Sequence, residues 1–144
     1  MVDIDLLRRK LSKLNTYLER LVPLGKKTFK EYKDDPYLRF SVERLIQLIV
    51  ECATDINNHV VVESGQKPPE DYRSSFVKAA DAGLIKLPLA RQLEGSAGMR
   101  NILVHEYMEI DDRIVFKAIP LTLKYYRRYL KAVYDFTEKI EKSK

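Results

Sequence analysis

One short segment of the chain, residues 99–107, concentrates the side chains that could carry out a reaction. Its sequence, Met-Arg-Asn-Ile-Leu-Val-His-Glu-Tyr, places an apolar strip among Arg100, Asn101, His105 and Tyr107. On a helix, at about 100° per residue, Asn101 and His105 stack one turn apart. Arg100 and Tyr107 then point in nearly the same direction. Arg100 and His105 are about 140° apart, so the arginine reaches the imidazole only in a groove or at an interface.

The chemistry that these residue types allow is proton transfer beside an anion. An imidazole can accept or donate a proton near neutral pH, and a guanidinium can hold phosphate oxygens. The alternative is structural: His105 would end a helix and interact favourably with the negative end of the helix dipole. The residues by themselves leave both interpretations open.

Other reactive side chains are sparse in this chain. The single cysteine, Cys52, excludes a disulfide framework and a cysteine-rich zinc site. The two histidines, His59 and His105, lie far apart in the sequence and have no cysteine pair beside them. Phosphate-binding loops, glycine-rich dinucleotide turns and HExxH zinc motifs do not occur. We therefore expect neither a metal ion nor a cofactor.

Two further segments invite a functional interpretation. Residues 55–59, Asp-Ile-Asn-Asn-His, form a polar end to an otherwise apolar helix, and we interpret them as a fraying surface turn rather than a second site. Gly95-Ser96-Ala97-Gly98 superficially matches the loop of a KH domain, but it lies inside a predicted helix. Small residues there would let a neighbouring helix approach closely.

The elements that must position these residues are helical. Leucines recur at three- and four-residue spacing in the first 21 residues, and Asp35 followed by Pro36 is a helix-start signal. Residues 113–117 are ambiguous, and Pro120 is expected to open the last helix. The first expected helix begins at Leu6, is interrupted near Pro23 and resumes through Tyr32. The other expected helices cover residues 37–63, 70–82 and 88–105, and a last one begins at Pro120. The helix over 37–63 is apolar on more than one side, which indicates burial by neighbours or by a second subunit.

Composition bounds the remaining possibilities. A chain of 144 residues, 45% hydrophobic and 33% charged, is typical of one globular domain. The net charge of +5 permits an anionic partner without requiring one, and basic residues concentrate at Lys124, Arg127, Arg128 and Lys131. The sequence contains no stretch typical of a transmembrane span or a signal peptide, so we expect a cytoplasmic protein that does not bind membranes.

The segment Arg100-x4-His105-x-Tyr107 resembles the R-x4-H-x-Y motif of HepT-like proteins, a branch of the HEPN superfamily. The flanking residues also match, since Arg-Asn opens the motif and Leu-Val-His closes its core. The order of predicted helices extends the resemblance over nearly the whole chain. It implies an all-α, antiparallel HEPN-type bundle of four to five helices, with residues 1–144 as a single domain that forms a homodimer.

The resemblance also implies a function. Members of this family are metal-independent ribonucleases that act as the toxin of a toxin–antitoxin pair, and the two motifs of the homodimer face a shared cleft. Arg100 and His105 would be catalytic, with Asn101 orienting the imidazole or the RNA. The expected antitoxin is a nucleotidyltransferase of the minimal, MNT type, which transfers AMP to the motif tyrosine, here Tyr107. The alternative is a non-catalytic helical dimer that binds nucleotides or scaffolds a partner.

Overall fold

The computed structural model describes residues 1–106 and 109–144, which form six α-helices and no strand. The expected all-α class is confirmed. There is one helix more than expected, because a short helix with its own capping box follows the first one. The helices are α1 (Ile4–Leu24), α2 (Phe29–Asp34), α3 (Pro36–Glu63), α4 (Tyr72–Asp81), α5 (Leu87–His105) and α6 (Asp112–Lys142).

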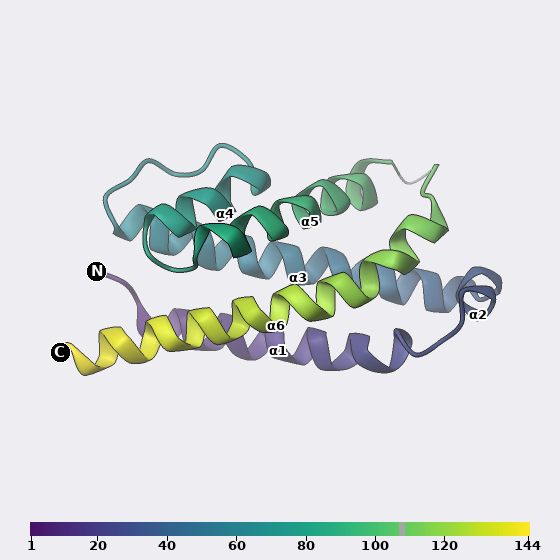
Figure 1. The fold of residues 1–144 in the computed structure, drawn as a ribbon, viewed down its shortest axis with the longest axis horizontal. Coiled ribbons are helices and arrows are strands. Elements are labelled where there is room, and N and C mark those ends of the chain that lie inside the picture. Colours follow the sequence, from purple (N-terminus) through teal and green to yellow (C-terminus); the bar gives the residue numbers. More distant parts are fainter. Residues whose placement is uncertain (107–108) are drawn as a thin grey trace.

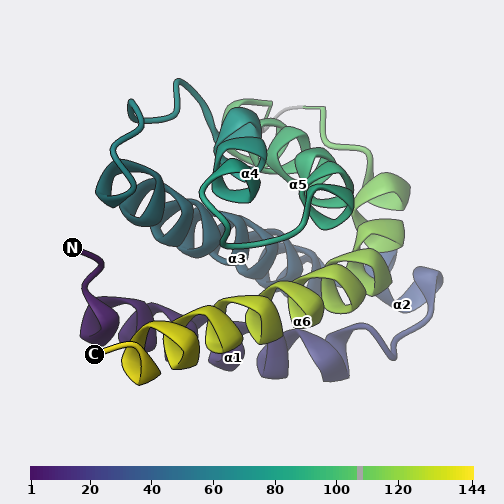
Figure 2. The same cartoon turned by 60° about the vertical axis from the view of Figure 1, so that its left-hand side comes forward.

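Helix α3 is the centre of the bundle. It lies between the antiparallel pair α4 and α5 on one side and the antiparallel pair α1 and α6 on the other (Figures 1 and 2). It packs against each of the other described helices, which explains why it is apolar on more than one side. None of the helices in the described ranges is long and apolar enough to cross a membrane.

Side-chain caps begin most of the helices. The Asp35 carboxylate accepts hydrogen bonds from the backbone N–H groups of Tyr37 and Leu38, and Pro36 occupies the first turn of α3. This confirms the predicted start of that helix. Asp71 caps α4 in the same way, and Gly83, with φ of +85°, lies in the turn that leads to α5.

The predicted start of the last helix is wrong. Pro120 lies inside α6, which begins eight residues earlier at Asp112. The Asp111 carboxylate accepts hydrogen bonds from the N–H groups of Arg113 and Ile114, so this aspartate caps the helix. Pro120 is exposed to solvent, where water can satisfy the backbone carbonyl that the missing N–H leaves unpaired.

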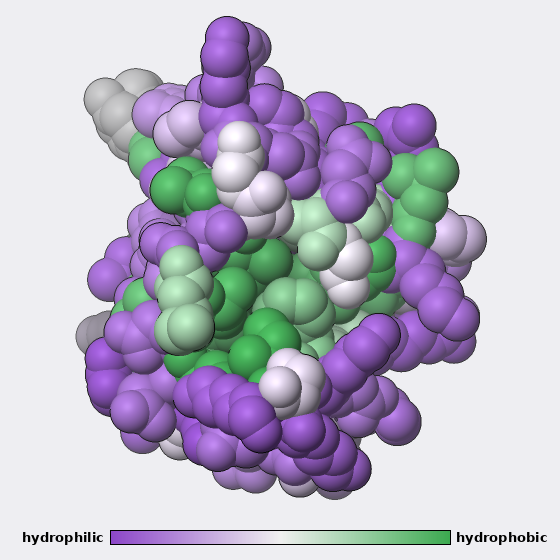
Figure 3. All heavy atoms as spheres, turned by 90° about the vertical axis from the view of Figure 1, so that its left-hand side faces the viewer, coloured by the Kyte–Doolittle hydropathy of each residue, from purple (hydrophilic) through white to green (hydrophobic). Residues whose placement is uncertain are grey.

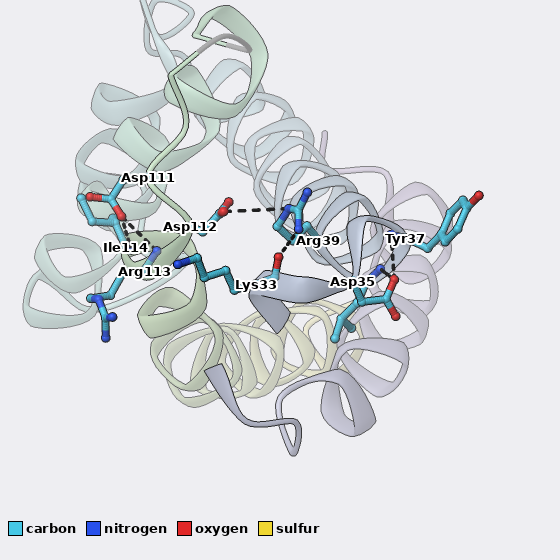
Figure 4. A network of polar contacts seen from close by, with 9 residues as sticks. Lys33, Asp35, Tyr37, Arg39, Asp111, Asp112, Arg113 and Ile114 are labelled. Carbon is cyan, nitrogen blue, oxygen red and sulfur yellow. Dashed lines mark hydrogen bonds and ion pairs between the residues drawn. The ribbon is translucent and has the colours of Figure 1, made fainter. Parts of the chain in front are cut away.

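A polar junction connects three helices at the end of the bundle where α6 begins. The Arg39 guanidinium of α3 donates a hydrogen bond to the Lys33 carbonyl of α2 and lies 3.9 Å from the Asp112 carboxylate of α6 (Figure 4). The Arg113 guanidinium stacks over the Phe29 ring, with 4.2 Å to its centre. These contacts hold the start of α6 beside α2 and α3, close in sequence to the motif.

Two buried tyrosines of α6 connect it to the rest of the core. The Tyr126 hydroxyl is 2.6 Å from the Ser96 hydroxyl of α5. The Tyr129 hydroxyl donates to Oδ1 of the fully buried Asn57 at 2.6 Å, and Asn57 donates in turn to Ser75 of α4. Burial raises the pKa of both tyrosines, so each hydroxyl keeps its proton at neutral pH.

At the end of the bundle that holds both termini, apolar side chains gather in a hollow on the surface (Figure 3). A groove of about 510 Å³ lies here between the turn that joins α4 to α5 and the C-terminal half of α6. Leu84 and Ile85 are buried beside it, and Leu89 and Phe136 are partly exposed. The groove lies at the opposite end from the motif.

Candidate active site

Arg100, Asn101 and His105 lie in the last two turns of α5. Pro88 stands in the first turn of this helix, and the helix ends at His105, where the N–H of Glu106 still donates to the Ile102 carbonyl. Helix α5 packs against α3, α4 and α6. The predicted bounds of 88–105 are therefore confirmed to within one residue.

The Arg100 side chain is held by residues of two other helices. Its Nε and Nη2 atoms both donate to Oε1 of Glu51 on α3, at 3.2 and 3.0 Å. Its guanidinium stacks on the ring of Tyr72, the first residue of α4, with 4.1 Å to the ring centre. Only 16% of the side chain is exposed. A long and otherwise mobile side chain is thereby fixed in one orientation before any ligand binds.

Asn101 connects Arg100 to the exposed face of the helix. Arg100 Nη1 donates to Asn101 Oδ1 at 3.3 Å, and both Asn101 and His105 are exposed, one turn apart. Among the described residues, the contacts of Arg100 are with Glu51, Asn101 and Tyr72, and His105 is not one of its direct partners. Asn101 therefore links the two residues: it accepts a hydrogen bond from Arg100 and lies one turn from His105 on the same face of the helix.

A second cation lies on this same face. A side chain at Gly98 would come within 3.0 Å of the Arg73 guanidinium, so the guanidinium of Arg73 lies over the bare backbone of α5 at this point. Gly98, Asn101 and His105 follow each other at three- and four-residue spacing and share one face of the helix. The expectation for the small residues is confirmed in part: Gly98 admits a side chain of α4, whereas Gly95 faces open space.

Tyr107, the fourth predicted site residue, lies outside the described residues.

The interpretation of residues 55–59 as a fraying turn is wrong, because α3 continues to Glu63. Asn57 is fully buried in the tyrosine network, and His59 Nε2 accepts a hydrogen bond from the backbone N–H of Asp3 at 2.9 Å. Asp55 pairs with Lys10 of α1 at 3.0 Å. These polar residues attach the N-terminal segment and α1 to the core, and they do not form a second site with the motif.

Cys52 is not a candidate nucleophile. Burial raises the pKa of its thiol to about 11, so the thiol keeps its proton at neutral pH.

Glu51, Tyr72 and Arg73 were not among the residues predicted from the sequence. A signal for Glu51 was present, since it is the one carboxylate in the run from Leu45 to Ala53. An ionised side chain in an apolar stretch needs a partner, and an arginine is the usual one. Tyr72 and Arg73 had no comparable signal, because only the packing of α4 on α5 brings them to Arg100 and Gly98.

This arrangement can bind a phosphodiester and transfer a proton next to it. Arg100 offers a fixed guanidinium, Arg73 adds positive charge, and Asn101 can donate or accept a hydrogen bond. His105 supplies a group that can exchange a proton with solvent or substrate. An all-helical bundle with an anchored arginine five residues before an exposed histidine has the features that the resemblance associates with the HEPN superfamily.

Comparison with known proteins supports this class. The family model described as "Ribonuclease HepT-like" matches residues 14–133. A "tRNA nuclease HepT" of Aphanizomenon flos-aquae is 30% identical over 145 residues, which cover 98% of this chain and 97% of the relative. An "mRNA nuclease HepT" of Shewanella oneidensis is 31% identical over 103 residues, 72% of this chain and 77% of the relative.

A solved structure shows the same fold. It is that of the tri-AMPylated HEPN toxin of Shewanella oneidensis in complex with an MNT antitoxin, with a TM-score of 0.81 and 27% identity. The match covers 94% of this chain and 99% of that one. The present chain belongs to the ribonuclease HepT-like family, as its motif indicated.

Proposed function

We propose that this protein is a metal-independent endoribonuclease and the toxin of a HepT/MNT-type toxin–antitoxin system. The observation that carries the proposal is the Arg100 guanidinium, fixed by Glu51 and Tyr72 and hydrogen-bonded to Asn101 one turn from His105. Two relatives that are named as tRNA and mRNA nucleases support RNA as the substrate. The whole chain would act as one cytoplasmic HepT-like domain.

The proposed reaction uses the nucleophile that RNA itself carries. His105 takes the proton of a 2′-hydroxyl group while the 2′-oxygen attacks the adjacent phosphorus. The bond from phosphorus to the 5′-oxygen breaks, which leaves a cyclic phosphate and a 5′-hydroxyl. Arg100 stabilises the negative charge on the phosphate oxygens as it builds up. Asn101 orients the imidazole or the RNA.

The leaving 5′-oxygen needs a proton, and we propose that His105 of the partner subunit donates it in a homodimer. An apolar groove of about 340 Å³ between α5 and α6 supports this assembly. Met99, next to Arg100, lines the groove, and so do Ile114 and Leu121, whose side chains are 53% and 54% exposed. A second copy of the chain on this groove would bury these side chains and bring a second motif close to the first.

The test of the function is cleavage of RNA by the purified protein in EDTA, with His105→Ala and Arg100→Ala variants. Each substitution should abolish cleavage without unfolding the protein, because loss of a proton-transfer group typically costs about 10²–10⁴ in rate. His59→Ala is the matched control, since the other histidine binds the N-terminal segment instead. Unchanged cleavage by a folded His105→Ala protein would reject this active site.

The partner that we propose is an MNT-type nucleotidyltransferase that inactivates the enzyme by AMP transfer to Tyr107. The similar toxin of Shewanella oneidensis is tri-AMPylated and bound to its MNT antitoxin. AMP on Tyr107 would add an anionic phosphodiester two residues from His105, where it would compete with RNA for the guanidinium groups.

Protein produced together with this antitoxin should carry one or more AMP units on Tyr107 and should not cut RNA. Tyr107→Phe should remain toxic and escape neutralisation, because it lacks the phenolic oxygen that accepts AMP. Intact mass spectrometry with peptide mapping checks the first statement, and a growth assay checks the second. Neutralised protein without the modification would show that the antitoxin acts by covering the site.

A further inference from the structure

One face of α6 carries six cations in a row, which we call the basic stripe. Its members are Arg113, Lys117, Lys124, Arg127, Arg128 and Lys131. At about 100° per residue they fall within an arc of about 100°, and all six are exposed. At about 1.5 Å per residue they span about 27 Å along the helix.

Little negative charge compensates the stripe. The sequence has no aspartate or glutamate between Arg113 and Tyr134. Among the ion pairs of the described residues, only that of Lys131 with Asp135 involves the stripe, and it is an exposed pair. The six cations exceed the net charge of +5, so the rest of the chain is close to neutral. The positive charge of this protein is therefore concentrated on α6.

This arrangement does not stabilise the isolated helix. Like charges repel when they stand four residues apart on a helix, and the stripe contains three such pairs: Arg113 with Lys117, Lys124 with Arg128, and Arg127 with Lys131. Lys124 and Arg128 also flank the Tyr125 ring, at 5.3 and 5.6 Å from its centre. Binding of a polyanion would lower the repulsion between these cations.

The stripe begins at the end of the bundle that holds the candidate active site. Helix α5 ends and α6 begins at the same end of the bundle, and α6 then runs to the opposite end (Figure 1). An RNA strand with one phosphate at Arg100 can continue along α6 over several further phosphates. A protein partner fits only half of this surface, because the three arginines are of a type enriched at protein interfaces but the three lysines are of a type depleted there.

We propose that the basic stripe is an RNA-binding surface, which holds the phosphate backbone of the substrate on one side of the cleaved bond. The proposal rests on the proposed ribonuclease function and extends it. Because the contacts are to phosphates, the stripe contributes affinity without sequence preference. The motif and the few nucleotides around it then decide where the strand is cut.

The test replaces Lys124, Arg127 and Arg128 with glutamine, which preserves helix propensity at three exposed positions. None of the three lines the α5–α6 groove that we assign to the dimer, whereas Lys117 of the stripe does and is therefore left unchanged. The matched control replaces three exposed cations of α1 with glutamine: Arg9, Lys13 and Arg20. Both sets are made in His105→Ala protein, so that a labelled single-stranded oligouridine that can span the stripe stays intact.

Fluorescence anisotropy over a salt series gives the readout. For single strands, the logarithm of affinity falls with the logarithm of salt by about 0.7 for each phosphate contact, so the stripe variant should lose about 2 from this slope. Its affinity at low salt should fall by about tenfold or more, and the α1 variant should match the parent. Each single substitution should lower the slope by about 0.7, which allows the test even if the triple variant unfolds.

Equal slopes for the two triple variants would overturn the proposal. So would a stripe variant that keeps its RNA affinity but no longer binds the nucleotidyltransferase, since the stripe would then be a protein-docking surface. Because the readout is binding, it is separate from the cleavage test. Stripe-dependent binding without any cleavage by the protein that retains His105 would reject the ribonuclease and leave the stripe as an RNA-binding surface.

Discussion

Arg100 depends on Glu51 for its orientation, because two of its nitrogen atoms donate to a single carboxylate oxygen. We expect Glu51→Ala to lower kcat by about 10- to 100-fold, since a misplaced catalytic group costs about that much. KM should not rise, because the guanidinium charge remains. Glu51→Gln, which retains an oxygen acceptor, should recover part of the activity. Steady-state cleavage kinetics separate the two constants.

A carboxylate on the same helix provides the control for Glu51. Glu43 lies about two turns earlier on α3, and burial raises the pKa of its carboxyl, with Asp112 acting in the same direction. Glu43→Gln should leave kcat unchanged. An equal loss in both variants, or a loss in Glu51→Ala that appears only in KM, would show that Glu51 has a general structural role.

At the same scale, the sequence identified the residues of the motif but not the residues that orient them. Arg100, Asn101 and His105 lie on one helix, so their spacing alone relates them. Glu51 and Tyr72 come from α3 and α4, and their contacts with Arg100 exist only once these helices pack. The periodicity of apolar residues describes one helix at a time, so it does not predict which side chains of different helices come into contact.

Among the helices, α6 gives the clearest prediction. If α6 is one helix from Asp112, Pro120→Ala should restore a backbone hydrogen bond and stabilise the protein by up to about 3 kcal/mol. Asp111→Ala should destabilise it by about 1 kcal/mol through loss of the cap. Urea unfolding measures both changes. A helix that began at Pro120 would give the opposite sign for Pro120→Ala.

The helices over 36–63 and 87–105 could be predicted closely because each has a proline in its first turn and no proline further inside. At Pro120 the same signal was misleading. Proline is favoured in a first turn and disfavoured in a helix interior, but exposure to water lowers the interior penalty. The aspartate cap nine residues earlier was the better signal. Separate helix-start signals compete, and packing decides between them.

For the whole molecule, the proposed dimer gives a direct prediction. Ile114→Lys combined with Leu121→Lys should convert the dimer to a monomer at micromolar concentration, because two charged groups would have to be buried in an apolar interface. Cleavage should be lost together with the dimer if the second proton comes from the partner subunit. Light scattering and the EDTA cleavage assay measure the two effects on the same samples.

Tyr134→Lys is the control for the dimer. Tyr134 is 56% exposed on the same helix but lines a different groove, beside Arg8 and Asn15 of α1. This variant should remain a dimer. A parent protein that is itself a monomer at this concentration would remove the shared cleft, and one Arg100 with one His105 would then have to carry out the whole reaction.

The hydroxyl groups of Tyr126 and Tyr129 fix the position of α6 along the bundle, because each forms a hydrogen bond with a specific residue of another helix. If α6 slid by one turn, both hydroxyls and Oδ1 of Asn57 would lose the hydrogen bonds that join α6 to α5 and α3, at about 1–3 kcal/mol for each buried group. None of these residues belongs to the motif or to the basic stripe. Substitutions in the proposed RNA-binding stripe should therefore change RNA affinity without disturbing the hydrogen bonds that fix the position of α6 along the bundle.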